Sequence, residues 1–203
     1  MAKNATQKSQ DKAHEIYQTA AQIFFTKGYN STSLNDIADA LNITKAGLYY
    51  YVESKQDLLF QIINLGLDRV EQEVLAPARA IADAQSRLEF IILNHARLSA
   101  EGNHAVTIIS HEVNELKFSH REETLRRRRE YFDFIRDTLV ELDAAGKLRD
   151  IDLTTATFTL LGMILWLSRW FSPRGKIPVE KVCQDVCEMA LKGLLRESQE
   201  KFG

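Results

Sequence analysis

Glycine, proline and cysteine are all scarce in this sequence of 203 residues. It contains 9 glycines and 3 prolines, and such low numbers favour long helices, whose interiors tolerate neither residue, over loop-rich β architectures. The two cysteines, Cys183 and Cys187, are too few for a disulfide scaffold. Hydrophobic residues make up 45% and charged residues 27% of the chain. This composition disfavours intrinsic disorder and allows a hydrophobic core.

Long hydrophobic runs are also absent. The longest one, residues 158–167, is interrupted by Thr159 and followed by Arg169. It is about half as long as a bilayer-spanning helix requires, and the polar N-terminus lacks the apolar segment of a signal peptide. We therefore expect a cytoplasmic protein that makes no membrane contact. The net charge of −2 excludes a wholly basic nucleic-acid coat but allows a local basic surface.

Apolar residues recur at helical spacing along most of the chain, and no segment alternates as a strand does. After a disordered arm at residues 1–10, a first helix is predicted to end at Gly28, which favours left-handed backbone. Ser33, Thr44 and Ser54 are typical N-caps of the next three helices. Further helices are predicted near residues 85–100, 102–116, 120–145, 152–171 and 178–198. The fold class is therefore all-α, with about nine helices: an N-terminal three-helix domain, residues 1–53, and a larger helical body, residues 54–203.

Residues 32–55 have the spacing of a helix-turn-helix. Their apolar positions let two short helices pack together while the second faces outward. The outward face offers hydroxyl, ammonium, glycine and tyrosine groups without an acid, and these suit DNA phosphates and base edges. Lys55 begins the next helix, where its charge and free N–H groups can meet a phosphate. The predicted DNA-binding residues are Ser33, Thr44, Lys45, Gly47, Tyr49, Tyr50 and Lys55. The alternatives are a helical hairpin that binds no DNA and, for Tyr49, a place in the core.

The order of these residues resembles the N-terminal domain of TetR-type transcriptional repressors, over roughly residues 12–60. The resemblance rests on Phe24-Phe25-x-x-Gly28-Tyr29, Thr32-Ser33-x-x-Asp36-Ile37-Ala38 and Ile43-Thr44-Lys45-x-x-Leu48-Tyr49-Tyr50-Tyr51-Val52-x-Ser54-Lys55-x-x-Leu58-Leu59. Val52 departs from the pattern, because the family usually has Phe there. The resemblance implies a homodimer that binds double-stranded operator DNA, an all-α ligand-binding and dimerisation body, and release from the operator when a small molecule binds.

The segment from Leu165 to Lys176 contains two tryptophans, one phenylalanine and three cations. Large aromatic side chains with arginine are typical of interface cores, and the last two helices of TetR-type proteins usually form the dimer contact. The predicted interface residues are Leu160, Met163, Leu167, Trp170, Val182, Val186 and Met189. Alternatively, Trp166 or Arg169 reaches a ligand channel.

The stretch from Trp170 to Glu180 also resembles a subgroup of TetR-type regulators of acyl-coenzyme A catabolism. A CoA thioester requires an apolar channel and cations for its phosphates. We therefore expect an acyl-CoA effector, with a free hydrophobic or aromatic compound as the alternative. The predicted ligand-binding residues are Trp166, Arg169, Arg174 and His111. The run Arg126–Arg129 spans a full helical turn, so most of it is expected to be solvated or paired with nearby glutamates.

Three other interpretations have less support. His104 and His111 share a helix face, but their spacing is not a strong metal-ligand pattern, and we expect neither a metal nor another cofactor. An enzyme is disfavoured because the sequence has no recognisable nucleophile–base pair, glycine-rich phosphate loop or metal quartet. An architectural DNA-binding protein without a ligand is disfavoured because a body of roughly 150 residues argues for a pocket. Cys183 and Cys187 are expected to pack as small apolar residues.

Overall fold

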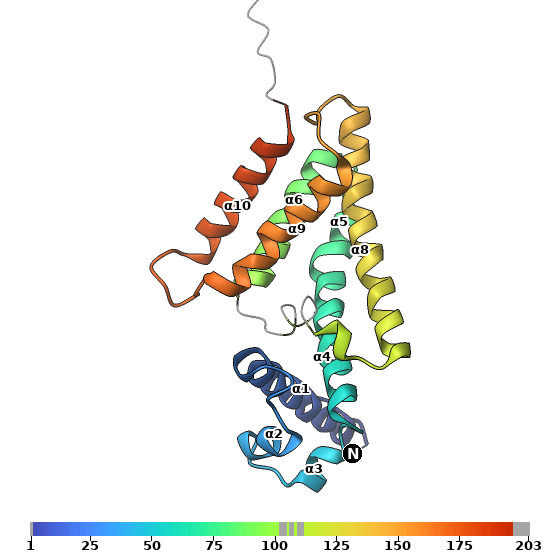
Figure 1. The fold of residues 1–203 in the computed structure, drawn as a ribbon, viewed down its shortest axis with the longest axis vertical. Helices are drawn as coiled ribbons and strands as arrows, with labels where there is room; N and C mark the ends of the chain where they lie inside the picture. Colours follow the sequence, from blue (N-terminus) through green and yellow to red (C-terminus); the bar gives the residue numbers. More distant parts are fainter. Residues whose placement is uncertain (1, 102–104, 106–107, 109–111, 197–203) are drawn as a thin grey trace, which may run out of the picture. The chain divides into compact units, whose positions relative to one another are not determined.

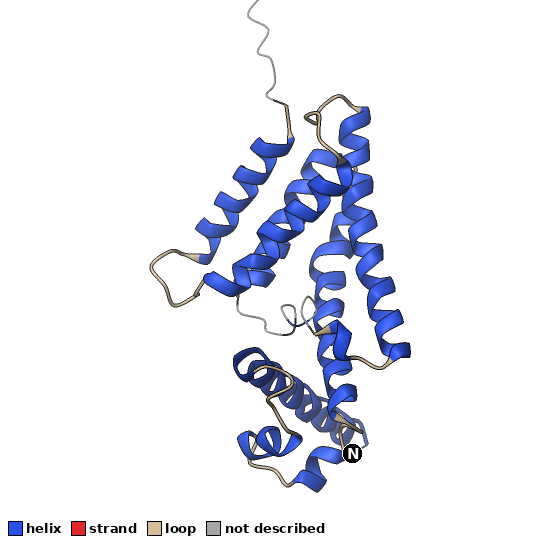
Figure 2. Cartoon of the chain, in the orientation of Figure 1, coloured by secondary structure: helices blue, strands red, loops and turns tan. Residues whose placement is uncertain are grey.

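The computed structural model describes residues 2–101, 105, 108 and 112–196. Over these residues the chain consists of helices joined by loops (Figure 2), with one isolated antiparallel bridge between Leu148 and Leu195 and no strand. The predicted all-α fold class is therefore confirmed.

The chain divides into two compact units. The first contains Met1–Asp68 and His104–Arg126, and the second contains Arg69–Asn103 and Arg127–Gly203. The first unit thus continues beyond residue 53 and includes a segment that lies, along the chain, between the two parts of the second. The functional division at residue 53 stays a prediction.

The helices of the first unit include the predicted helix-turn-helix (Figure 1). They are α1 (Ala2–Lys27), α2 (Leu34–Ala40), α3 (Lys45–Tyr49) and most of α4 (Lys55–Val70), together with the short 3-10 helix η2 (Val113–Glu115) and the first turns of α8 (Phe118–Ala144).

The N-terminal arm was predicted wrongly. Residues 1–10 were expected to be disordered, but α1 already begins at Ala2. Alanine, lysine and glutamine predominate in this stretch, and their high helix propensity lets the helix extend over positions that lack an apolar stripe. The other end is as predicted: Gly28 has a φ of 85°, and its N–H donates to the Phe24 carbonyl at 3.0 Å.

The core of the first unit joins α1 to α4 with the distant segment. Ile16, Phe24 and Leu48 are buried with Val52, whose smaller side chain is 2% exposed. The segment contributes four buried residues to the same core: Ala105, Ile108, Val113 and Leu116. The helix-turn-helix is thus held by residues that lie far from it in the sequence.

The second unit is built from the remaining helices (Figure 1). These are the π-helical turn η1 (Glu71–Leu75), α5 (Ala76–Arg79), α6 (Ala84–Ala100), the later part of α8, α9 (Leu153–Trp170) and α10 (Val179–Leu194). The predicted positions of α6, α8, α9 and α10 agree with the structure to within a few residues. The helical path continues past Pro77. Just before this proline, the π-turn lets the Ala76 N–H donate to the Glu71 carbonyl, which lies one residue further back than the acceptor in an α-helix.

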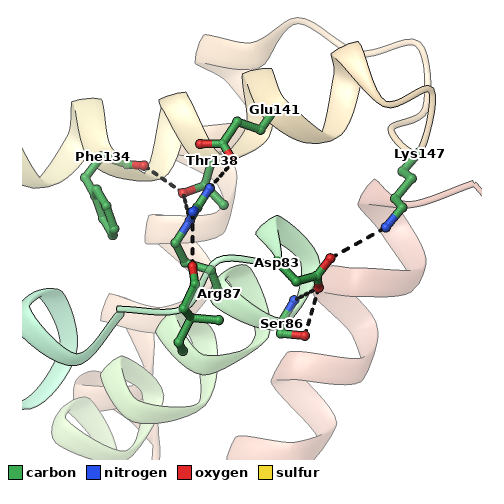
Figure 3. A network of polar contacts seen from close by, with 8 residues as sticks. Asp83, Ser86, Arg87, Phe134, Thr138, Glu141 and Lys147 are labelled. Atoms are coloured by element: carbon green, nitrogen blue, oxygen red, sulfur yellow. Dashed lines mark hydrogen bonds and ion pairs between the residues drawn. The ribbon is translucent and has the colours of Figure 1, made fainter. Parts of the chain in front are cut away.

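A polar network fixes α6 against α8 (Figure 3). The Asp83 carboxylate caps α6 by accepting the Ser86 N–H at 2.8 Å. The Arg87 guanidinium is 9% exposed; its Nε donates to Thr138 Oγ1 at 3.1 Å, and it forms an ion pair with Glu141 at 2.5 Å. A buried guanidinium is tolerated when it is paired and hydrogen-bonded in this way.

Both cysteines are buried, free thiols on α10. Burial raises the pKa of Cys187 to about 11 and also raises the pKa of Cys183. The prediction that they pack as small apolar residues is confirmed by their places in the core. Within the part of the chain that the structure describes, no helix has the length and apolarity needed to cross a membrane.

Candidate DNA-binding and ligand-binding sites

The start of α2 is held by a reciprocal pair of hydrogen bonds. The Asp36 N–H donates to Ser33 Oγ at 3.2 Å, and the Ser33 N–H donates to Asp36 Oδ2 at 2.7 Å. The hydrogen bonds from Ser33 hold the pKa of the Asp36 carboxyl below its usual range. These two bonds form a capping box, and the predicted N-cap at Ser33 is confirmed. At the end of α2, Asn42 takes a left-handed conformation with a φ of 52°, which asparagine tolerates better than most residues.

Thr44 fixes the beginning of α3. Its Oγ1 accepts the Gly47 N–H at 3.0 Å, as the predicted N-cap requires. A Cβ at Gly47 would lie 3.2 Å from the same oxygen, so a larger residue would press on the cap. Leu48, which belongs to α3, is fully buried, and its burial directs the opposite face of the helix to solvent.

The outward face of α3 presents the residues that the sequence predicted. Thr44 and Lys45 are exposed, and no acid lies on α3. Tyr49 is 47% and Tyr50 79% exposed, so Tyr49 does not belong to the core. Hydroxyl, ammonium and tyrosine groups together form a surface suited to a DNA groove.

Lys55 lies at the first position of α4, over an aromatic ring. Its Nζ is 4.2 Å from the centroid of Tyr29, and the Tyr29 ring packs edge-on against Phe24 with centroids 5.1 Å apart. Burial raises the pKa of Tyr29 to about 12, with a further contribution from Glu115 and Glu112. The phenol therefore stays neutral and supports the ammonium group through a cation–π contact. Sequence analysis gave Tyr29 no role beyond the family pattern.

Glu115 attaches the distant segment to the helix-turn-helix unit. Its backbone carbonyl accepts a hydrogen bond from Gln56 Nε2 at 3.0 Å, and its carboxylate accepts one from Asn30 Nδ2 at 3.3 Å. Sequence analysis did not find this contact, because nothing local indicates that residues 115 and 56 meet. His104 and His111, which the sequence predicts on one helix face, lie outside the described residues.

The predicted ligand-binding residues are dispersed on the surface. Trp166 is 62% exposed, Arg169 is exposed near the end of α9, and Arg174 is exposed in the loop before α10. They do not enclose a buried space by themselves. Among the described residues, no three histidine, cysteine, aspartate or glutamate side chains are grouped as metal ligands.

Three of the predicted interface residues are buried within the single chain, and the dimer contact as a whole stays a prediction. Leu160, Leu167 and Val182 are 2%, 0% and 5% exposed within one chain, so they pack mainly in the core of their own chain. The reason is that α6 packs against both α9 and α10 and covers their most regular apolar stripes.

The opposite faces of α9 and α10 carry large apolar side chains. Trp170 is 53% and Met189 66% exposed, while Met163 and Val186 are half-buried. Phe158, which sequence analysis missed, is 62% exposed and lies on α9 two turns before Trp166.

Comparison with protein families identifies both parts of the chain. Residues 16–62 match the family of bacterial regulatory proteins called tetR, and residues 82–194 match the tetracyclin repressor-like C-terminal domain. The second match alone spans more than half of the chain. The chain belongs to the TetR family. It is a TetR-type transcriptional repressor and not an enzyme.

Several full-length relatives agree with this assignment. The chain is 27% identical over 186 residues to the transcriptional repressor KstR2 of Rhodococcus jostii (strain RHA1), covering 89% of each protein. It is 34% identical to AibR in a complex with isovaleryl coenzyme A and operator DNA, with a TM-score of 0.81 over 87% of this chain and 96% of AibR. It is 30% identical to PfmR from Thermus thermophilus, with a TM-score of 0.78 over 89% of this chain and 99% of PfmR.

Proposed function

We propose that this TetR-type repressor acts in the cytoplasm as a homodimer on an inverted-repeat operator and is released by an acyl-CoA thioester. The observation that carries the effector class is the 34% identity to AibR, whose structure holds both isovaleryl coenzyme A and operator DNA. Sequence similarity of this extent covers the ligand-binding part as well as the DNA-binding part.

DNA binding is assigned to residues 1–53 together with Lys55. The face formed by Ser33, Thr44, Lys45, Gly47, Tyr49 and Tyr50 enters a major groove, and Lys55 binds an adjacent phosphate. The N-cap of α3, the burial of Leu48 and the exposure of the two tyrosines support this role. In a two-fold dimer, two such helices meet successive grooves about 34–36 Å apart, which is why the operator is an inverted repeat.

Dimerisation is assigned to the outer faces of α9 and α10. Trp170, Met163, Val186 and Met189 are assigned to this surface, and exposed aromatic and methionine side chains are enriched in interface cores. A two-fold contact between such helix pairs is self-complementary.

The CoA part of the effector is assigned to Trp166, Arg169 and Arg174. A thioester has an apolar acyl end and a phosphate-rich end that remains hydrated. Exposed cations at the end of α9 and in the following loop suit the phosphates, and an exposed indole suits the adenine ring.

Operator release tests this proposal. Wild-type protein bound to labelled DNA from its own upstream region is titrated with CoA thioesters, with the matching free acids and with hydrophobic drugs. We expect thioesters to weaken operator binding by about 5–150-fold, the usual range of allosteric coupling, and free acids to act less. Release by drugs alone, with no response to any thioester, would identify the alternative effector class.

Variants then separate the two ends of the ligand. Arg169→Ala and Arg174→Ala should weaken the thioester response and leave operator affinity unchanged, because both residues lie in the second unit. Arg136→Ala, which removes another exposed cation of that unit, is the control. Equal responses from all three variants would contradict the assignment of the CoA phosphates.

A further inference from the structure

Helices α6 and α8 run antiparallel in the second unit, and two contacts fix their register. Arg87 Nε donates to Thr138 Oγ1 at 3.1 Å, and the Tyr131 hydroxyl lies 2.6 Å from His95 Nδ1. Residue 87 of α6 pairs with residue 138 of α8, and residue 95 pairs with residue 131, so residue numbers rise along one helix as they fall along the other. The next turn of α6, at Ser99, is therefore level with the turn of α8 at residues 127–128.

Two polar side chains on this stretch of α6 are buried without a hydrogen-bond partner. His95 and Ser99 are each 2% exposed, and neither His95 Nε2 nor Ser99 Oγ is bonded to a described residue. They are four residues apart and thus share one face of the helix. Buried polar groups are nearly always satisfied in folded proteins, so two orphans on successive turns indicate a ligand that completes them.

His95 is a neutral imidazole in the folded protein. Burial lowers its pKa to about 4, so the ring is neutral and carries a single N–H. The Tyr131 hydroxyl and His95 Nδ1 are hydrogen-bonded at 2.6 Å, and the tautomer of His95 decides which of them donates. In either tautomer, His95 Nε2 is buried without a hydrogen-bond partner among the described residues.

A cation lies at the same level of α8. Arg128 is one turn before Tyr131 and hence on the same face. It is half-buried, and burial lowers the pKa of its guanidinium. Arg87, buried between the same two helices, is paired with Glu141, whereas no described carboxylate pairs with Arg128. The run of arginines was expected to be solvated or paired, and Arg128 is the exception.

We propose that His95 Nε2, Ser99 Oγ and the Arg128 guanidinium form the polar end of the effector site and bind the acyl oxygen of the ligand. The Ser99 hydroxyl and the Arg128 guanidinium are hydrogen-bond donors, and His95 Nε2 is a third donor when Tyr131 donates to Nδ1. Such a set of donors suits the carbonyl oxygen of a thioester or the carboxylate of the corresponding acid. The buried Ala96 and Ile92 of α6 provide apolar surroundings for a short acyl chain. This inference rests on the proposed function, because it specifies where the second unit holds the acyl end.

Direct binding tests the inference with the full-length dimer. Calorimetry is performed with isovaleryl-CoA, isovalerate and CoA alone on wild type, Ser99→Ala, Arg128→Met and the control Arg129→Met, whose arginine is exposed on the same helix. Ser99→Ala should weaken the binding of ligands with an acyl group by about 2–10-fold, and Arg128→Met by about tenfold or more. Affinity for CoA alone and for the operator should not change.

Thermal unfolding supplies a readout that a structural role would not give. Because the Ser99 hydroxyl is buried without a partner, Ser99→Ala should raise the Tm of the ligand-free protein by about 2–4 °C. The same substitution should weaken the binding of the acyl ligands. If wild type binds the acyl ligands and both variants bind them equally well, the inference is wrong and the effector class stands. If Arg128→Met weakens CoA alone, Arg128 binds a phosphate, and the acyl-oxygen assignment is wrong. If wild type binds none of the three ligands, the proposed effector class fails, and the inference with it.

Discussion

The ammonium group of Lys55 lies 4.2 Å above the ring of Tyr29, at the first turn of α4. The ring is anchored by Phe24 and shielded from ionisation by burial. This contact holds a cation at a helix N-terminus, an arrangement that favours a phosphate. Tyr29 thus positions a residue that the sequence identified only by its charge.

We expect Lys55→Gln to weaken binding to every DNA sequence by a similar factor, because a phosphate contact carries no base information. The slope of log affinity against log salt should fall by about 0.9, the value of one phosphate contact. Fluorescence anisotropy at several salt concentrations measures both. Lys147→Gln, which removes an exposed cation of the second unit, should change neither quantity, and an unchanged slope in Lys55→Gln would rule out the phosphate contact.

Thr44 and Tyr49 should separate folding from recognition. Thr44→Ala removes the acceptor of the Gly47 N–H and should destabilise the protein by about 1 kcal/mol, whereas Thr44→Ser keeps the cap.

Tyr49→Ala changes a side chain that is 47% exposed and should alter stability by no more than about 0.5 kcal/mol. Both alanine variants should lose operator affinity. Denaturation and anisotropy curves on the same samples provide the comparison, and wild-type operator affinity in Tyr49→Ala would remove Tyr49 from the contact surface.

Met189 should decide the dimer surface. Its side chain is 66% exposed in one chain, so Met189→Asp leaves the monomer core intact but buries an unpaired charge in the proposed interface, which costs about 3–5 kcal/mol. Sedimentation should show monomers, and operator binding should be lost with the dimer. Gln184→Asp places the same charge on another exposed position of α10 and should remain dimeric. A dimeric Met189→Asp protein would place the interface elsewhere.

Local features of the fold were predictable because short-range physics determines them. The caps at Ser33, Thr44 and Ser54 and the left-handed Gly28 each depend on neighbours within four residues. The exposure of Tyr49 and Tyr50 followed from helical periodicity once Leu48 was placed inward.

Long-range features were not predictable in the same way. A regular apolar stripe shows that a helix face is buried, but not whether its own chain or a partner buries it. Leu160 and Leu167 were therefore assigned to the dimer contact, although α6 covers them. The contact of Gln56 with Glu115 and that of His95 with Tyr131 join residues far apart in the sequence, and only the tertiary structure brings them together.

His95 should make stability depend on pH. Its pKa falls from 6.5 to about 4 on burial, so the unfolded chain takes up a proton at a higher pH than the folded one. The contribution of neutral His95 to the free energy of unfolding is complete above pH 6.5 and is lost as the pH falls toward 4. It amounts to roughly 3 kcal/mol between these two pH values. Burial raises the pKa of Tyr131, which contacts His95, so the phenol does not titrate in this window. Urea unfolding of wild type at pH 7.5, 6 and 5 should show the loss, and His95→Gln should show less of it. An identical pH dependence in the two proteins would mean that His95 is accessible to protons in the folded state.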